Sequence, residues 1–206
     1  MASLYDRFVL PKILGCACAT SPIMKQRVKI VPKAQGRVLE LGIGSGLNLK
    51  FYDPAKVSEV RGVDPSPELR QMAATAERDP TLKVTVEDGT AEALPFEDRS
   101  FDTVVCTYTL CSVCTPAQAL SEARRVLKPG GRFLFCEHGL APDAGVAKWQ
   151  RRIDPIWSKL FGGCHITRPV SGTLKAAGFT VEQLDTMYLP KTPRIAGWNE
   201  WGAARP

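Results

Sequence analysis

The residues of this 206-residue chain that suit chemistry near neutral pH are two histidines and seven cysteines. His138 directly follows the apolar run Arg132–Glu137, and His165 stands in a later segment, after Asp154. An imidazole titrates close to physiological pH, so a well-placed one can take a proton from an attacking group. A thiol suits such a base, because a pKa of about 8.5 requires only a modest push toward the thiolate. We therefore expect His138, and also His165 with Asp154, as candidate catalytic residues, while an ordinary structural role for each stays open.

The cysteines do not follow the spacing of a familiar metal site. Cys16 and Cys18 are too close together for the usual zinc pair, and the Cys111-x-x-Cys114 pair has no second pair at ligand spacing. The Cys111–Cys114 pair continues an apolar run, whereas a redox motif of this spacing opens a helix after a strand. We expect Cys106, Cys111 and Cys114 to be reduced and mostly buried, and we expect no bound metal. An arsenite acceptor held by these three thiols stays open as an alternative.

A glycine-rich stretch, VLELGIGSGLNLKFY, follows the first apolar run and carries Gly42, Gly44 and Gly46. A dinucleotide-binding loop would have its third glycine at position 47, where this chain has leucine. A Walker phosphate loop is excluded, because no Lys-Ser or Lys-Thr pair follows. Glycines at alternate positions let the backbone turn sharply and approach a ligand closely. The pattern favours a ligand held against uncharged backbone, and a simple tight turn is the alternative.

Two acids follow the next candidate strands. Asp64 comes directly after Glu59–Val63, and in doubly wound sheets an acid at that place binds the hydroxyl groups of a ribose. Asp88 follows Lys83–Val86 and is placed to reach an adenine amino group. For each acid a solvated turn is the alternative. Because parallel strands end at one edge of a sheet, we expect a nucleoside-containing ligand there.

Short β-rich runs alternate with helical patterns, which is typical of a parallel sheet with crossover helices. The candidate strands are Arg37–Leu41, Glu59–Val63, Lys83–Val86, Phe101–Thr107, Arg132–Glu137, Phe179–Leu184 and Trp198–Ala203. The candidate helices are Pro67–Arg78, Pro116–Leu127 with a Pro-Gly-Gly stop, Val146–Leu160 and Ser171–Ala177.

The composition is that of a soluble globular protein, with 44% hydrophobic and 23% charged residues. The net charge is +6, but no block of five basic residues occurs, so we expect no nucleic-acid partner. No run approaches the ~18 apolar residues of a membrane span, and no signal peptide is evident. We expect a cytoplasmic location, with peripheral membrane contact through an N-terminal amphipathic helix still open. The sequence carries no signal for an oligomeric state.

Four segments together resemble the successive motifs of the class I S-adenosylmethionine (SAM)-dependent methyltransferases. They are LELGIGSG, GVDPSPEL, EDGTAEALPFEDRSFDTVV and ARRVLKPGGRFLF, and they span residues 37–137. The resemblance implies an α/β fold with a doubly wound, mostly parallel, seven-stranded Rossmann-like sheet and helices on both faces. It also implies SAM as cofactor and S-adenosylhomocysteine (SAH) as product.

The same resemblance implies roles for individual residues. The glycines would pack under the methionine part of SAM, Glu40 would lie beside its amino group, and Asp64 would bind the ribose. Asp88 would lie at the adenine, and Thr107 near the sulfonium. The full set of cofactor-binding residues that it implies is Glu40, Gly42, Gly44, Gly46, Asn48, Asp64, Pro65, Asp88, Gly89, Thr90, Ala91 and Thr107.

Three stretches outside these motifs, VVCTYTLCSVCTP, FCEHGLAP and WQRRIDPIWSKLFGGCHITRP, resemble the methyltransferase-like 7 proteins, which are alkyl thiol methyltransferases. The resemblance implies a small thiol as methyl acceptor. Arsenite, an amine such as a phospholipid head group, and a non-catalytic SAM-binding protein stay open. The side chains of Trp149, Trp157, Phe161 and Ile166 predict an apolar wall for the acceptor or, equally, ordinary core packing.

We expect one domain over residues 1–206, which is a length that a single core can support. Residues 1–35 would form a helical lid of two helices or of a helix and a loop. Residues 37–137 would form the SAM-binding core, residues 138–178 an acceptor-site insertion, and residues 179–206 the final strands.

Overall fold

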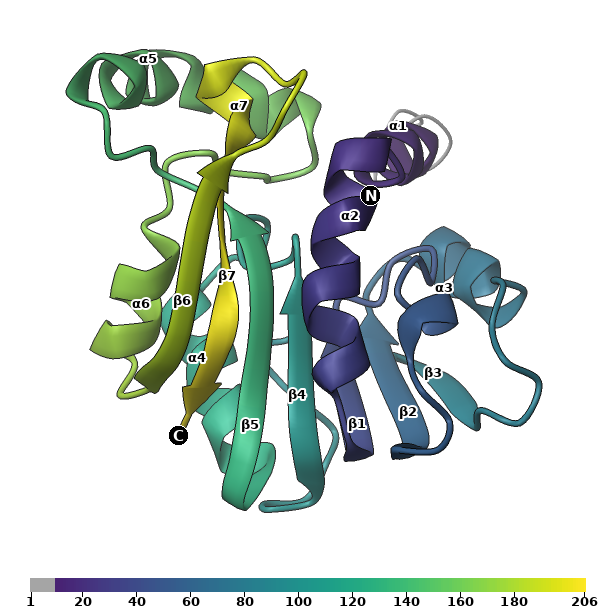
Figure 1. Cartoon of the computed structure of the whole chain (residues 1–206). Coiled ribbons are helices and arrows are strands. Elements are labelled where there is room, and N and C mark those ends of the chain that lie inside the picture. The colour runs from purple at the N-terminus through teal and green to yellow at the C-terminus, as the bar shows by residue number, and fades with distance from the viewer. Residues whose placement is uncertain (1–9) are drawn as a thin grey trace.

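The computed structural model of the chain describes residues 10–206, with the backbone alone at residues 12 and 14. The chain forms a seven-stranded sheet in the order β3-β2-β1-β4-β5-β7-β6 (Figure 1). β1 to β5 run parallel to one another, and β7 runs antiparallel to its neighbours β5 and β6. The strands are β1 Gly36–Leu41, β2 Val57–Asp64, β3 Val84–Asp88, β4 Phe101–Thr107, β5 Leu127–His138, β6 Thr180–Tyr188 and β7 Trp198–Arg205. The predicted doubly wound, mostly parallel sheet of seven strands is confirmed.

Helices cover both faces of the sheet. They are α1 Leu10–Cys18, α2 Ser21–Ile30, α3 Pro67–Ala74, α4 Pro116–Val126, α5 Ala144–Leu160, α6 Val170–Ala176 and α7 Arg194–Gly197, with 3-10 turns η2 Val31–Lys33 and η3 Leu49–Phe51. Ile30 of α2 and Ala73 of α3 belong to the core on one face, and Leu120 of α4 and Leu174 of α6 to the core on the other. The N-terminal segment thus forms two helices over its described part, and residues 1–9 of the expected lid lie outside the described residues.

The interior strand β5 contributes side chains to both cores. Phe133 and Phe135 are fully buried in the core beside α4, while Leu134 and Cys136 are fully buried in the core beside α2. Successive side chains of a strand point to opposite faces, so an unbroken apolar run is what a strand covered on both sides requires.

The start of β5 differs from the prediction. The strand begins at Leu127 instead of Arg132, so the Pro-Gly-Gly turn that was predicted to separate helix and strand lies within the strand. Its register against β4 changes between Phe101 and Thr103, and the additional residues form a bulge there. Pro129 has no backbone N–H to donate to a ladder, and bulges are one of the places where a strand tolerates that loss.

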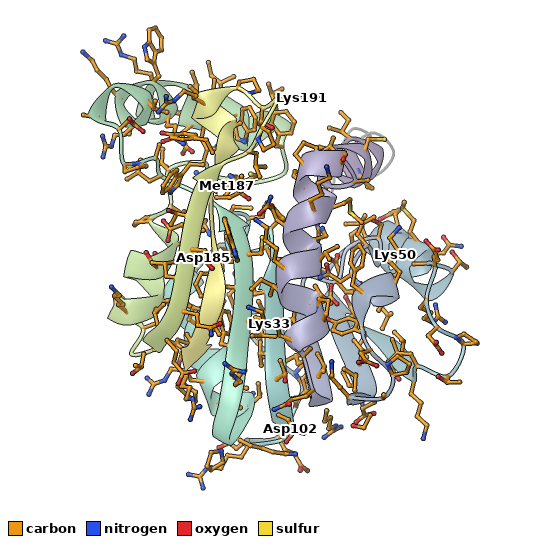
Figure 2. All side chains as sticks on the ribbon, viewed as in Figure 1. Lys33, Lys50, Asp102, Asp185, Met187 and Lys191 are labelled. Carbon is orange, nitrogen blue, oxygen red and sulfur yellow. The ribbon has the colours of Figure 1, made fainter. Side chains whose placement is uncertain are left out.

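The parallel strands all begin at one edge of the sheet and end at the other. Figure 2 shows Asp102, near the start of β4, at the lower edge, where its carboxylate accepts a hydrogen bond from the Arg37 backbone N–H at 2.8 Å. α1 and α5 lie at the opposite edge, where β1, β2, β4 and β5 end (Figure 1). Loops that follow different strands therefore meet at this edge, where doubly wound sheets bind their ligands. Among the helices of residues 10–206, none has the length and apolar character needed to cross a membrane.

Candidate active site

A cavity of about 410 Å³ lies at the carboxyl edge of the sheet. The loops after β1, β2, β3 and β4 line it, and α1 and α2 complete its wall with Leu10, Pro11, Gly15, Cys18 and Arg27. The N-terminal helices that the sequence predicted as a lid thus contribute to the wall, and a movement of these helices stays a prediction.

The glycine loop after β1 shapes the floor of the cavity. Gly42 has a φ of +60°, and a Cβ there would lie 2.5 Å from the side chain of Thr109, so only glycine fits. Gly44 has a φ of +57°, but a Cβ there would meet only the Gly42 carbonyl oxygen, at 3.9 Å. Because Gly44 lines the cavity, a side chain at this position would project toward a ligand. Gly46, at +79°, packs against α3 and does not line the cavity.

Asp64 closes one end of the cavity. Its side chain is buried, and its two carboxylate oxygens accept the backbone N–H groups of Gly44 at 3.0 Å and Ser66 at 2.9 Å. Burial raises the pKa of this carboxyl, and the two backbone hydrogen bonds oppose the rise. A carboxylate oxygen has two lone pairs, so each retains one for a further donor such as a ribose hydroxyl. Pro65 lines the cavity beside it, in agreement with its predicted place.

The adenine end is only partly as predicted. Gly89, Thr90 and Ala91 line the cavity. Asp88, the register partner of Asp64 on the edge strand β3, is exposed and accepts a hydrogen bond from Arg70 at 2.7 Å. Asp88 does not line the cavity, so its contact with adenine stays a prediction.

Glu92 does line this end of the cavity and was not anticipated from the sequence. Its carboxylate accepts the backbone N–H groups of Cys114 at 2.7 Å and Thr115 at 3.2 Å. These bonds tie the loop after β3 to the residues that precede α4. An acid in the run EDGTAEALPF gives no sequence signal that separates it from its neighbours.

A buried hydrogen-bond network joins residues on both sides of the glycine loop to α2 and the end of β4. Glu40 accepts hydrogen bonds from Asn48 at 2.8 Å and from the Tyr52 hydroxyl at 2.7 Å. Asn48 in turn accepts a hydrogen bond from Arg27 at 2.9 Å, and Arg27 also donates to the Thr107 hydroxyl at 2.6 Å. Burial raises the pKa of Glu40 to about 7. The structure thus brings together three of the predicted residues, of which Thr107 lines the cavity.

Arg27 is a second candidate residue of the cavity that sequence reasoning missed. Its side chain is buried, its guanidinium lies 5.1 Å from the centre of the Tyr108 ring, and its Nε has no hydrogen-bond partner among the described residues. An arginine fork matches the geometry of a carboxylate, which is what the methionine part of SAM presents. A single arginine in a helix outside the motif region carries no sequence signal for this role.

These groups fit SAM along the length of the cavity. Asp64 offers acceptors for a ribose, and Arg27 offers a positive group for an α-carboxylate. Glu40 does not line the cavity, so its contact with the amino group stays a prediction. No phosphate cradle is needed for this cofactor. SAM would supply a methyl group on a positively charged sulfur.

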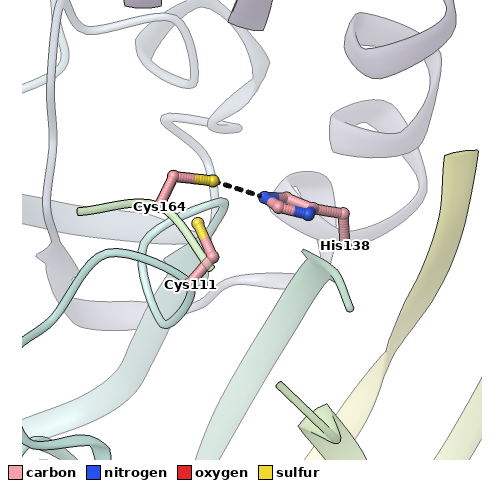
Figure 3. A group of neighbouring side chains, drawn as sticks. All are labelled: Cys111, His138 and Cys164. Carbon is pink, nitrogen blue, oxygen red and sulfur yellow. Dashed lines mark hydrogen bonds between the residues drawn. The ribbon is translucent and has the colours of Figure 1, made fainter. Parts of the chain in front are cut away.

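The predicted base, His138, lies behind the cavity wall. Its ring stacks on Tyr108, which lines the cavity, with centroids 6.2 Å apart, and its Nε2 is 3.2 Å from the Cys164 sulfur. Burial lowers the pKa of His138, but the neighbouring Cys164 and Glu137 raise it, and the net result is a raised pKa. Cys111 lies beside this pair (Figure 3).

The other two catalytic candidates pair with each other. His165 Nδ1 lies 2.7 Å from one carboxylate oxygen of Asp154, whose second oxygen accepts the Ile166 backbone N–H at 2.8 Å. Neither side chain lines the cavity. The pair holds the loop after α5 to the helix itself, which is a structural role.

The predicted apolar wall does not form around the cavity. Trp149 is 57% exposed on α5, Ile166 is fully buried, and Trp157 packs on Phe161 with ring centres 4.3 Å apart. None of these four lines the cavity, and Gly162 is the described residue of the segment 138–178 that does. The helix predicted at Val146–Leu160 is present as α5, but its sequence left open which side chains face the cavity.

The described cysteines are free thiols. Cys106 and Cys111 are buried as predicted, but Cys114 is exposed, and this part of the prediction is wrong. Cys114 stands at the end of the apolar run, just before α4, where the chain returns to the surface. Cys114 is also the member of this trio that lines the cavity.

Comparisons with known proteins agree with this geometry. Residues 39–135 match the family model of the methyltransferase domain. A protein of Rattus norvegicus named thiol S-methyltransferase TMT1B is 37% identical over 171 residues, which cover 78% of this chain and 68% of the relative. Its namesake in Homo sapiens is 35% identical over 182 residues, covering 83% and 74%. A Thermotoga maritima structure described as a SAM-dependent methyltransferase, possible histamine N-methyltransferase, matches with a TM-score of 0.69 and 23% identity over 98% of this chain and 97% of its own, which shows the fold alone.

Proposed function

The chain belongs to the methyltransferase-like 7 family of SAM-dependent methyltransferases, and we propose that within this family it methylates the sulfur of a small thiol. The observation that carries the proposal is the extent of the likeness. The domain model spans residues 39–135, whereas the likeness to the thiol S-methyltransferases covers 78% to 83% of the chain. The likeness therefore includes residues outside the cofactor core, where a class I methyltransferase recognises its acceptor.

The residues of the cavity would position the two reactants. Asp64 would hold the ribose and Arg27 the carboxylate of the cofactor, so that the methyl group is presented near Thr107. Glu40 would act from behind the cavity, through Asn48, which accepts a hydrogen bond from Arg27. Methyl transfer is an in-line displacement, and most of its acceleration comes from such positioning. The attacking sulfur must lose its proton first, because the thiolate is the nucleophile.

His138 is our candidate for helping that deprotonation. Its ring is separated from the cavity by Tyr108, so it would act on the acceptor through the groups around it and not by direct contact in this conformation. We expect His138→Ala to lower the rate roughly ten- to a hundred-fold at pH 7. Raising the pH toward the pKa of the thiol should recover most of this loss, because the thiol then ionises unaided. A deficit that stays constant from about pH 6 to 9.5 would rule out the role in deprotonation.

The cavity also bears on the other acceptors. The arsenite alternative was expected on Cys106, Cys111 and Cys114, and Cys114 is the one of these three that lines the cavity, so this trio does not form an arsenite site there. A cytoplasmic location, peripheral membrane contact and a small-molecule partner remain part of our proposal. All seven cysteines are free thiols, which suits a reducing compartment.

A methyl-transfer screen with purified protein tests the acceptor. The assay follows a radiolabelled methyl group from SAM to small alkyl thiols and sulfide, with arsenite, amines, phenols and a phospholipid as competing acceptors. We expect transfer to the alkyl thiols, and its loss in Asp64→Ala at a SAM concentration near the KM of the unaltered chain. Transfer to another acceptor class with none to any thiol would contradict the proposal. Binding of SAH without transfer to any acceptor would favour a non-catalytic SAM-binding protein.

A further inference from the structure

Three side chains from distant parts of the chain converge behind the cavity wall. Cys111 follows β4, His138 ends β5, and Cys164 lies in the loop after α5. One ligand atom of each, two sulfurs and an imidazole nitrogen, lies within 4.8 Å of the other two. Figure 3 shows the two sulfurs and the His138 nitrogen turned toward one another. Both cysteines are buried, with exposed fractions of 3% and 8%.

The loops that carry the two cysteines are held together by bonds outside the cluster. The Cys111 carbonyl oxygen accepts the His165 backbone N–H at 2.8 Å. Arg168 donates hydrogen bonds to the carbonyl oxygens of Leu110 and Val113, on either side of Cys111. The relative positions of the two sulfurs are thus set by the surrounding structure, as a preformed metal site requires.

The charge around the cluster also favours a cation. Glu137 is fully buried beside His138, and its Oε1 accepts the backbone N–H groups of Thr109 at 2.8 Å and Leu110 at 3.2 Å. Its Oε2 is buried with no hydrogen-bond partner among the described residues. Burying an unpaired carboxylate is costly, and a nearby cation would offset much of that cost.

We propose that Cys111, His138 and Cys164 bind one Zn²⁺ ion, and that its fourth position takes the sulfur of the acceptor thiol. Zn²⁺ prefers sulfur and nitrogen ligands in tetrahedral geometry, and sites with three protein ligands leave the fourth position open for substrate. The proposal of a metal site depends only on the positions of these three side chains. The role of the fourth position rests on the proposed thiol methylation. In this site His138 would assist deprotonation as a ligand of the Zn²⁺ ion, which lowers the pKa of the bound thiol, and not as a free base.

The cluster borders the cavity where the methyl group would be presented. Ser112, next to Cys111, lines the cavity, and so does Gly162, two residues before Cys164. Cys18 of α1 also lines it. A thiol bound at the fourth position would therefore lie beside the cavity, with α1 over it.

The chemistry balances without a further reactant. The thiol binds Zn²⁺ in exchange for water and releases its proton to solvent, because a coordinated thiol ionises readily. Its sulfur then forms a bond to the methyl carbon while the bond from that carbon to the sulfonium breaks. The electron pair of the broken bond stays on the departing sulfur and gives neutral SAH. The methylated product is a neutral thioether, a weaker zinc ligand than the thiolate, and it leaves.

The metal site is tested first, on the full chain purified under reducing conditions. We expect about one zinc ion per chain by elemental analysis, and uptake of added Zn²⁺ after chelation. Cys111→Ser and Cys164→Ser should each weaken zinc binding at least about 100-fold, since each removes a ligand. Cys16→Ser is the matched control, because its thiol is exposed and lies outside the cluster. Binding of SAH by calorimetry shows that each variant is folded.

Two results would overturn the metal site. One is failure of the unaltered, reduced chain to take up stoichiometric Zn²⁺ or Co²⁺. The other is a disulfide between Cys111 and Cys164 under the same reducing conditions, detected by mass spectrometry.

The open position is tested with Co²⁺ in place of Zn²⁺, because the cobalt–thiolate absorption band grows with each added sulfur ligand. A small alkyl thiol should strengthen this band, and Cys18→Ser should leave it unchanged. Loss of intensity in Cys18→Ser would make Cys18 the fourth ligand and overturn the open position. Thiol methylation without a spectral change on adding thiol would also overturn it and leave the proposed function standing. Metal binding without any thiol methylation would instead contradict the proposed function.

Discussion

The cofactor side of the site, at the ends of β1 and β2, and the acceptor side, at the ends of β4 and β5, are assembled differently. Each contains a buried glutamate, Glu40 in β1 and Glu137 in β5. The oxygens of Glu40 accept hydrogen bonds from Asn48 and Tyr52, which follow it within 12 residues. Glu137 instead accepts the backbone N–H of Thr109 across 28 residues. Local sequence therefore specifies the environment of the first acid, and only folding specifies that of the second.

The same contrast holds for the groups that would meet the reactants. Asp64 and the Gly44 N–H that it accepts lie within one strand–loop–strand unit, 20 residues apart. Cys111, His138 and Cys164 come from three separate segments. Residues that are close together in the sequence form a motif with a recognisable spacing. Residues from distant segments have no fixed spacing, so no sequence pattern identifies them. We expect the two sides to differ also in their contributions to stability, to cofactor binding and to methyl transfer.

The largest effect is expected from removing Glu40. Glu40→Ala would leave the Tyr52 hydroxyl and the Asn48 amide buried without their acceptor, and it would create a cavity. We expect the free energy of unfolding to fall by about 3–5 kcal/mol in urea denaturation. Glu77→Ala, whose side chain is 80% exposed, is the control and should change it by less than about 0.5 kcal/mol. Equal effects of the two substitutions would show that the network contributes nothing to stability.

The next largest effect is a pH dependence of the free energy of unfolding, which also comes from Glu40. Its pKa is about 7 in the folded chain against 4.5 for the ordinary carboxyl, so the folded state holds the proton more tightly. Its contribution to stability is full below about pH 4.5 and is lost as the pH rises to about 7. Without cofactor, stability relative to Glu40→Gln should fall by about 2–3 kcal/mol between pH 4.5 and 8. A constant difference between the two proteins over this range would contradict the raised pKa.

A smaller effect should separate the two acids at the ends of β2 and β3. Asp64→Ala should weaken SAH binding by about 1–3 kcal/mol, because it removes acceptors from a buried ribose. Asp88→Ala, its register partner, should change the affinity by less than about twofold, since its side chain is exposed and bonded to Arg70. Isothermal calorimetry with SAH measures both. An equal loss of SAH affinity in Asp88→Ala would support the predicted contact between Asp88 and adenine.

The smallest effect is expected on the outer surface of the acceptor side. Trp149→Ala removes a ring that is 57% exposed and contacts Arg152 at 5.3 Å. It should change the free energy of unfolding by less than about 1 kcal/mol and leave methyl transfer unchanged. Ile166→Ala, at a fully buried position, is the positive control and should cost about 2–5 kcal/mol. A lower rate of methyl transfer in Trp149→Ala would indicate that α5 contributes to the acceptor site.

Much of the fold follows from local pattern. β4 occupies the residues predicted for it, and α4 begins at the predicted Pro116, because period-2 and period-3.6 apolar patterns are properties of short segments. The start of β5 was misplaced, because a Pro-Gly-Gly turn and a strand bulge look alike until the neighbouring strand is in place. α7, a helix of four residues at Arg194–Gly197, is too short for any pattern.

The candidate site divides in the same way. The glycine loop and Asp64 could be named from sequence, because their order along the chain is itself the signal, whereas the place of Glu40 was implied by the resemblance to the class I methyltransferases. Arg27 could not be named, since its role depends on α2 lying across the ends of β1 and β4. Equally, no spacing joins Cys164 to His138.

The amino-acid sequence by itself determined the alternation of strands and helices, because apolar periodicity is a property of short segments, and the likeness of its motifs to known methyltransferases gave the cofactor and the family of the chain. Only the tertiary structure decided which side chains reach the cavity. In the folded chain Trp149 is exposed, and His138 stacks on Tyr108 and lies close to Cys111 and Cys164. Packing of β4, β5 and the loop after α5 sets these positions, and such packing depends on contacts between segments that no local pattern encodes.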